Sequence, residues 1–162
     1  MVEEIRIPQC SKPLLGYRVR FIDGKLRIRF YHFTDEEAEV ARLFILEGPL
    51  QGEWYCDIRL PSRKAKFVGE LEEPWRTMWL HLTSKRIDLL CVQRDTIHII
   101  EVKRYMLSSG VGQLLTYRDM FEETYKPIVP VELWYVTYYP DPDVIEICRR
   151  HGIRTWSVIK VE

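Results

Sequence analysis

The chain has 162 residues, of which 46% are hydrophobic and 12% aromatic, with 8 glycines and 9 prolines. This composition is typical of a single globular domain, and it excludes a disordered, collagen-like or low-complexity protein. The 24 basic residues balance the 24 acidic residues, so the chain also lacks the overall basic charge of many nucleic-acid binders. Any polyanionic substrate must therefore be held by a local site.

The cysteines and the chain start bear on the cellular compartment. Cys10, Cys56, Cys91 and Cys148 lie far apart without a CxxC pair, which argues against a zinc ribbon and favours a reducing environment. No apolar signal segment opens the sequence, and no run approaches the roughly 18 apolar residues that a bilayer span needs. We therefore expect a cytoplasmic protein that does not enter a membrane. Asparagine is absent and charged residues reach 30%, as thermophilic proteins favour.

The N-terminal part of the chain predicts a β-hairpin followed by a helix. Tyr17–Phe21 and Lys25–Phe30 alternate in hydropathy around Asp23-Gly24, a dipeptide that favours the tight turn of a hairpin. Thr34-Asp35-Glu36-Glu37 then matches a capping box, and apolar residues at helical spacing follow it. This pattern predicts a helix that ends near Leu46.

Hydrophobic periodicity and turn residues define the remaining elements. The predicted strands are Trp54–Leu60, Arg86–Val92, Ile97–Val102, Val131–Tyr138 and Ile153–Ile159, and the predicted helices are Val111–Tyr125 and a short one after the Asp141-Pro142 N-cap. Pro61–Pro74 is expected to be a connection, while Trp75–Leu82 leaves helix and strand open. The final strand, helix and strand predict a right-handed parallel crossover, and hence an α/β fold with a mixed central β-sheet flanked by helices.

The central hairpin carries an unusual group of charged residues. If its turn is centred between residues 94 and 95, Asp88 lies directly opposite Glu101. Cross-strand partners have Cβ atoms about 4.5–5.5 Å apart, so these carboxylates repel each other unless a cation such as a divalent metal ion lies between them. Strand alternation puts Lys103 on the same face as Glu101 and Val102 on the opposite face. A simpler interpretation, an exposed strand end with a surface ion pair, stays open.

These residues also resemble a known superfamily. Asp88, a spacer of twelve residues and then Glu101-Val102-Lys103 at the end of an isoleucine-rich strand resemble the core of the PD-(D/E)XK nucleases. The helix that follows carries Gln113 and Tyr117 on one face, and one branch of the superfamily has a Gln and a Tyr at this spacing. Ile87 stands where the motif has its proline.

The resemblance implies a fold and a domain organisation. It covers about Thr34 to Val161 in element order, so it implies a restriction-endonuclease-like core over residues 34–161. The N-terminal β-hairpin, within residues 1–33, belongs to no part of that core and is expected to be an extension of the same single domain.

The resemblance further implies metal-dependent hydrolysis of phosphodiester bonds, with DNA as the expected substrate. Asp88, Glu101 and the Val102 carbonyl would bind Mg²⁺ or Mn²⁺ through hard oxygen ligands. Lys103 would position the attacking water or act on it as a base, and Gln113 would orient the lysine or a phosphate. Contacts to the nucleic acid around the site are expected from Lys85, Arg86, Arg104, Tyr117 and Arg118.

Several alternatives remain at this point. Glu37 can complete the metal site, although its place in the capping box favours a structural role. The chain can also be a nucleic-acid or protein interaction module that keeps the fold without the chemistry. A homodimer formed through exposed tryptophan and tyrosine side chains is a third possibility.

Overall fold

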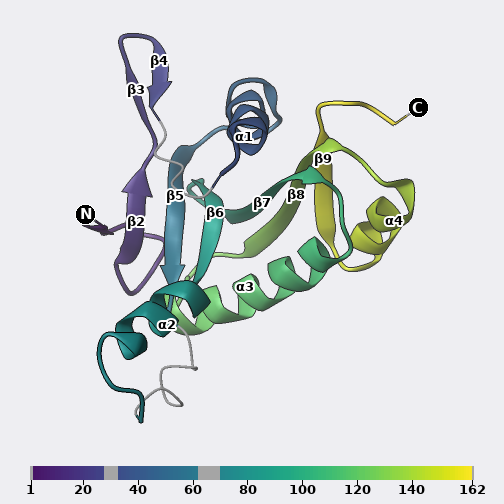
Figure 1. Cartoon of the computed structure of the whole chain (residues 1–162). Helices are drawn as coiled ribbons and strands as arrows, with labels where there is room; N and C mark the ends of the chain where they lie inside the picture. The colour runs from purple at the N-terminus through teal and green to yellow at the C-terminus, as the bar shows by residue number, and fades with distance from the viewer. Residues whose placement is uncertain (1, 28–32, 62–69, 162) are drawn as a thin grey trace.

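The fold is a mixed α/β structure built on one large sheet (Figure 1). The computed structural model describes residues 2–27, 33–61 and 70–161. Within them, seven strands form that sheet: β1 (Glu3–Ile5), β2 (Leu14–Arg18), β5 (Glu53–Leu60), β6 (Lys85–Val92), β7 (Ile97–Tyr105), β8 (Val131–Tyr139) and β9 (Ile153–Ser157). They lie side by side in the order β1-β2-β5-β6-β7-β8-β9. The pairs from β1 to β7 are antiparallel, and β7, β8 and β9 are parallel, which confirms the predicted mixed sheet.

Helices cover both faces of the sheet (Figure 1). The described part of the chain contains four of them: α1 (Asp35–Glu47), α2 (Trp75–Thr83), α3 (Ser109–Tyr125) and α4 (Pro142–Arg150). Buried side chains of α1 pack in one apolar layer, while those of α3 and α4 pack in the other. The segment that sequence left open, Trp75–Leu82, is helical. No helix of the described residues is long and apolar enough to cross a bilayer.

The N-terminal segment is divided between two sheets. A separate two-stranded sheet consists of β3 (Arg20–Ile22) and β4 (Lys25–Arg27). Asp23 and Gly24 adopt φ values of 52° and 70°, as the tight turn of a hairpin requires, so the predicted hairpin is confirmed over residues 20–27. Tyr17 and Arg18, predicted in its first strand, pair with β5 instead. Residues 28–30 of its second strand lie outside the described residues, as do residues 62–69 of the predicted connection. The main sheet also contains β1, which was not predicted, and β2, of which only Tyr17 and Arg18 were predicted as strand.

The central strands have the predicted register and faces. Leu89 pairs with Ile100, and the pairs that follow keep the same offset up to Val92 and Ile97. Of the apolar residues on these strands, Leu90, Val92, Ile97 and Ile99 pack in the layer of α3, and Leu89, Cys91, Ile100 and Val102 pack in the layer of α1. Both faces are apolar because helices cover both.

Two neighbouring strands change face at the same level of the sheet. Tyr55 and Ile58 of β5 pack in the same apolar layer although they are three residues apart, and so do Ile87 and Leu90 of β6. Regular alternation would place such residues on opposite faces. The irregularity lies at Asp57 on β5, which has a φ of 55°, and at Asp88 on β6. Both residues lie between two regular cross-strand pairs, Cys56 with Leu89 and Ile58 with Ile87.

Candidate functional site

The site begins where β6 and β7 separate. Their ladder ends at the pair Leu89–Ile100, one step before the predicted pair of Asp88 and Glu101. Instead of a further backbone pair, Asp88 Oδ2 accepts a hydrogen bond from the backbone N–H of Val102 at 2.9 Å. The carboxylate of Asp88 is thus fixed to the backbone of the neighbouring strand.

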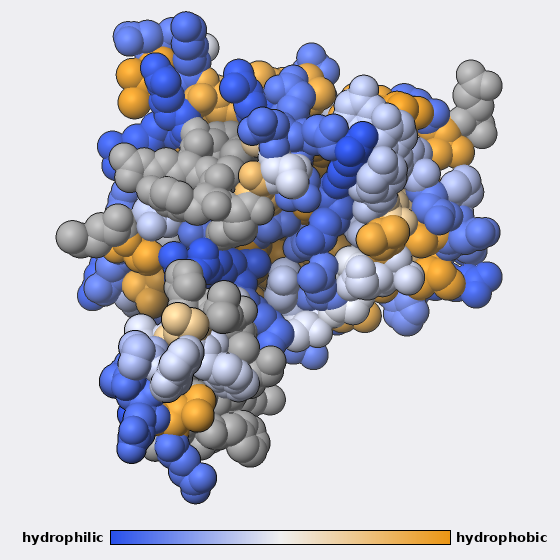
Figure 2. All heavy atoms as spheres, viewed as in Figure 1, coloured by the Kyte–Doolittle hydropathy of each residue, from blue (hydrophilic) through white to orange (hydrophobic). Residues whose placement is uncertain are grey.

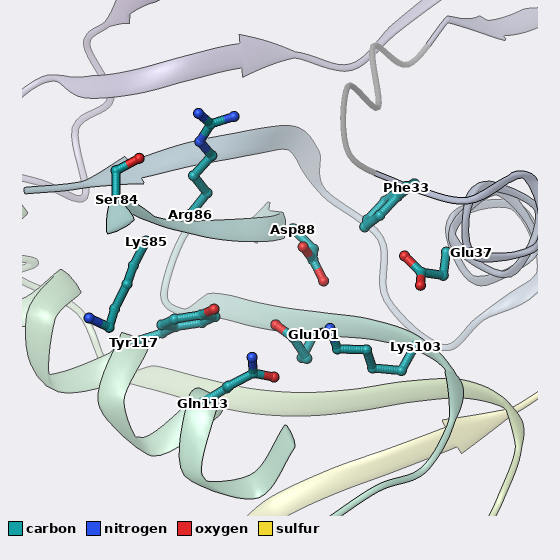
Figure 3. A pocket seen from close by; sticks show the side chains of 10 residues that line it. All are labelled: Phe33, Glu37, Ser84, Lys85, Arg86, Asp88, Glu101, Lys103, Gln113 and Tyr117. Atoms are coloured by element: carbon teal, nitrogen blue, oxygen red, sulfur yellow. Dashed lines mark ion pairs between the residues drawn. The ribbon is translucent and has the colours of Figure 1, made fainter. Parts of the chain in front are cut away.

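A cleft of about 410 Å³ opens at this point (Figure 3). Its lining comes from β6, β7, α1, α3 and the turns that lead into them: Phe33, Glu37, Ser84, Lys85, Arg86, Asp88, Glu101, Lys103, Gln113 and Tyr117. Figure 3 shows the side chains of Asp88, Glu101 and Lys103 turned toward one another across the gap between the two strands. Most of the residues singled out from sequence therefore share one cavity.

Glu101 and Lys103 form an ion pair on one face of β7. Lys103 Nζ lies 3.3 Å from Glu101 Oε1, as strand alternation predicted. Burial raises the pKa of Glu101 to about 7, although Lys103 opposes the shift. Burial also disfavours the charged lysine, but the carboxylates of Glu101 and Asp88 outweigh it, so the pKa of Lys103 is raised. Lys103 is therefore protonated at neutral pH.

Burial makes the Asp88 carboxyl and the Tyr117 hydroxyl costly to ionise, and neighbouring carboxylates add to this cost. Burial and then the Glu101 carboxylate raise the pKa of Asp88 well above its usual range. Burial also raises the pKa of the Tyr117 hydroxyl, and both carboxylates add to the shift. The Asp88 and Glu101 carboxyl groups are thus costly to ionise together, which is a physical reason for a cation to bind between them.

The helix α3 delivers Gln113 and Tyr117 to the cleft. Its N-terminal turn packs close to β8, because a Cβ atom at Gly110 would overlap the Tyr135 ring. The Tyr135 hydroxyl in turn donates to the Leu107 carbonyl at 2.8 Å, just before the helix. Within the described residues, Gln113 Oε1 is buried without a hydrogen-bond partner. Such an atom is expected to find a partner when a ligand or water enters.

Glu37 serves two purposes on α1. Its backbone N–H donates to Thr34 Oγ1 at 3.2 Å, so Thr34 is the predicted N-cap. Its side chain lines the cleft opposite Asp88 (Figure 3). The Glu37 carboxylate also raises the pKa of Asp88 and Glu101, as a smaller cause than burial. The structural role and a role in the site are therefore compatible.

Two of the predicted nucleic-acid contacts lie elsewhere. Arg104 extends from β7 to α1, where its NH1 is 2.7 Å from Glu36 Oε2, and it lines a separate hollow with Tyr138 and Tyr139. Arg118 is directed to Asp119 at 3.7 Å and does not line the cleft. Neither residue lines the cleft, because Arg104 and Arg118 each follow a cleft residue directly and so project from another face. Their contact with a nucleic acid stays a prediction.

Lys85 and Arg86 both line the cleft but point in different directions. Lys85 extends toward the side chain of Tyr117 on α3 (Figure 3). Arg86 extends toward β5, away from Asp88 (Figure 3), and its NH1 is 3.7 Å from Asp57 Oδ1. The sequence analysis did not single out Asp57. The available signal was an acidic residue in the mostly apolar segment Trp54–Leu60, two positions before Arg59.

The donors of the cleft fit a hard divalent cation. Within the described residues, Glu101 Oε2 is buried without a hydrogen-bond partner, and Asp88 supplies a second carboxylate a short distance away. Carboxylate and carbonyl oxygens are the ligands that Mg²⁺ takes, and Mg²⁺ usually keeps several waters beside one or two carboxylates. No group of three or more His, Cys, Asp or Glu side chains in the described ranges is arranged to hold a metal by itself. A cation here would therefore rely on two carboxylates, a backbone carbonyl and water.

Comparisons with profiles of known protein families, with curated proteins and with solved structures give no match to this chain. What the site can do must therefore be argued from its own geometry.

Proposed function

We propose that this chain is a divalent-metal-dependent nuclease with a restriction-endonuclease-like core, which hydrolyses phosphodiester bonds in DNA. The observation that carries the proposal is the buried carboxylate pair of Asp88 and Glu101, with protonated Lys103 3.3 Å from one of them. Two acids and a lysine at the open end of otherwise apolar strands are costly to bury without a role. The same three residues carry the resemblance to the PD-(D/E)XK superfamily.

The roles follow from the chemistry of each group. Asp88, Glu101 and the Val102 carbonyl would hold Mg²⁺ or Mn²⁺. Bound in this way, the ion lowers the pKa of a coordinated water and offsets the negative charge of the phosphate. Lys103, being protonated, stabilises the negative charge that develops on the phosphoryl oxygens rather than acting as a base. This choice between the two roles rests on its raised pKa.

The residues of α3 complete the site from the other side. The Tyr117 hydroxyl keeps its proton because its pKa is raised, so it can donate a hydrogen bond to a phosphate oxygen. Gln113, whose Oε1 has no partner among the described residues, can accept from Lys103 or from the attacking water. These two side chains orient the reacting groups without changing charge.

A cleavage assay tests the proposal. Single-stranded, duplex and branched DNA are incubated with the protein and Mg²⁺ or Mn²⁺, beside Asp88→Asn and Lys103→Ala. Asp119→Asn, which removes an exposed carboxylate outside the cleft, is the matched control. We expect cleavage by the wild type and the control only. Equal traces of cleavage in all four proteins would indicate a contaminant, and DNA binding without metal-dependent cleavage would indicate an interaction module.

A further inference from the structure

Two arginines face each other on β5 and β6 beside the cleft. Arg59 and Arg86 are direct cross-strand partners, and like charges in such a pair destabilise a sheet. Asp57 lies between them, with Oδ2 3.5 Å from Arg59 NH2 and Oδ1 3.7 Å from Arg86 NH1. In this cluster, two guanidinium groups that face each other favour anions around them.

The guanidinium groups are held away from bulk water. The side chain of Arg86 is 15% exposed and that of Arg59 is 26% exposed. Arg59 Nε is buried and has no hydrogen-bond partner in the described part of the chain. A buried donor of this kind costs free energy until an acceptor arrives, and a phosphate oxygen is a strong acceptor for arginine.

The backbone holds the cluster in an uncommon conformation. Asp57 adopts a φ of 55°, in the left-handed region that few residues other than glycine occupy. Gly16 on β2 leaves the space that this conformation needs, because a Cβ there would lie 3.2 Å from the Asp57 carbonyl oxygen and 2.5 Å from Ile58 Cδ1. The Tyr125 hydroxyl donates to the Arg59 carbonyl. Strained positions of this kind concentrate at functional sites.

The cluster adjoins the carboxylate pair. Asp57 occupies the register position opposite Asp88, and Arg86 lines the same cleft as Asp88. Two residues along a strand span about 7 Å, which is close to the distance between successive phosphates along one nucleic-acid strand. A nucleic-acid strand that reaches Asp88 with one phosphate can therefore place a neighbouring phosphate at Arg86.

We propose that Arg59 and Arg86, positioned by Asp57, form a binding subsite for a phosphate that flanks the scissile one. This inference rests on the proposed nuclease function, since it takes the carboxylate pair as the place of cleavage. Asp57 is a positioning residue, because it contacts the two arginines and not the substrate. It keeps both guanidinium groups in place before the substrate arrives, so less side-chain freedom is lost on binding.

Binding in the absence of metal tests the subsite. The probe is a fluorescein-labelled single-stranded DNA of 20 nucleotides, measured by fluorescence anisotropy in EDTA at several salt concentrations. We expect Arg59→Gln to weaken binding about tenfold and to reduce the slope of log affinity against log salt by about 0.7, the value for one phosphate contact on a single strand. Arg150→Gln removes an exposed arginine of α4 and should change neither quantity. An affinity and slope of Arg59→Gln equal to those of the wild type would overturn the subsite.

A second variant tests the role of Asp57. Asp57→Asn makes the cluster more positive. If Asp57 only neutralises the arginines, this variant should bind the same probe more tightly. Positioning predicts weaker binding, and the Arg59→Gln substitution should then cost less in the Asp57→Asn background than in the wild type. Circular dichroism checks that each variant is folded. Tighter binding by Asp57→Asn would contradict the positioning role, while the result for Arg59→Gln alone still tests the subsite.

The failure of the subsite and the failure of the nuclease proposal are distinguishable. The binding measurements contain no metal and no cleavage step. Loss of affinity in Arg59→Gln together with no metal-dependent cleavage by the wild type would keep the phosphate subsite and reject the nuclease. Cleavage by the wild type together with unchanged binding by Arg59→Gln would keep the nuclease proposal and reject the phosphate subsite.

Discussion

Asp88 accepts, at 2.9 Å, a hydrogen bond from the backbone N–H of Val102, so one side chain takes the place of the next backbone pair between β6 and β7. This contact fixes one oxygen of the carboxylate. It also means that, beyond the last backbone pair Leu89–Ile100, β6 and β7 are connected by the Asp88 side chain instead of by a further backbone pair.

Substitution of Asp88 by asparagine should separate metal binding from folding. The amide oxygen can still accept from Val102 N–H, so we expect a folded protein. Wild-type protein with Mn²⁺ at about 100 times its dissociation constant should gain about 2.7 kcal/mol of stability, a rise in Tm of roughly 5–10 °C for this size. Asp88→Asn should show no such rise in differential scanning fluorimetry, and its cleavage rate should fall at least about 100-fold. A full Mn²⁺ shift in Asp88→Asn would contradict the assignment of this ligand.

The metal-free protein should lose stability as the pH rises. Burial raises the pKa of Glu101 from 4.5 to about 7, so between these values the folded state holds a proton that the unfolded state has released. The free energy of unfolding therefore falls from about pH 4.5 to about pH 7 and then levels off, by at most about 3 kcal/mol.

Urea unfolding in EDTA at pH 5, 6, 7 and 8 measures this effect. Because other groups titrate as well, the quantity to compare is the difference between the wild type and Glu101→Gln. That difference should shift in favour of Glu101→Gln as the pH rises. Glu39→Gln, an exposed glutamate of α1, is the matched control. Parallel pH profiles for the wild type and Glu101→Gln would rule out a raised pKa at this position.

Lys103 should matter for the reaction and not for metal binding. Its raised pKa keeps it charged at neutral pH, so its loss removes a stabilising charge from the transition state. We expect Lys103→Gln to lower the cleavage rate about 100- to 1,000-fold and to keep the Mn²⁺-dependent rise in Tm. Lys103→Arg, which retains the charge, should recover part of the rate. Equal rates for Lys103→Arg and Lys103→Gln would argue against an electrostatic role.

Two glycines of α3 offer a matched pair for stability. A Cβ at Gly110 would overlap the Tyr135 ring, whereas a Cβ at Gly112 meets nothing within 4 Å. Gly110→Ala should therefore lower the free energy of unfolding by about 1–3 kcal/mol, and Gly112→Ala should raise it by up to about 1 kcal/mol. Urea unfolding of both variants measures the difference. Equal stabilities would show that α3 can move away from β8 without cost.

Sequence predicted the centre of the site because its determinants are local. A short turn and strict alternation fix the register of a hairpin, so the common face of Glu101 and Lys103 followed from counting residues. The same alternation accounts for the position of Arg104. It follows Lys103 directly, and alternation alone puts it on the opposite face of β7, where it meets Glu36.

Other features depend on contacts between distant segments. The short strands β1 and β2 are held in the sheet by pairing with each other and with β5, which no local pattern reveals. The left-handed conformation of Asp57 is equally hidden, since it depends on the space left by Gly16 on a neighbouring strand. Arg59 and Arg86 are recognised as neighbours only when the pairing of β5 with β6 is known.

The strand β7 leaves β6 after Ile100 but stays paired with β8 as far as Tyr105. Its last residues, Glu101 to Tyr105, are therefore held firmly from one side and turn their other edge toward Asp88 and the cleft. An extended ligand can reach the two carboxylates without breaking any bond between strands. In the part of the chain that the structure describes, access to the two carboxylates thus requires no opening of the sheet.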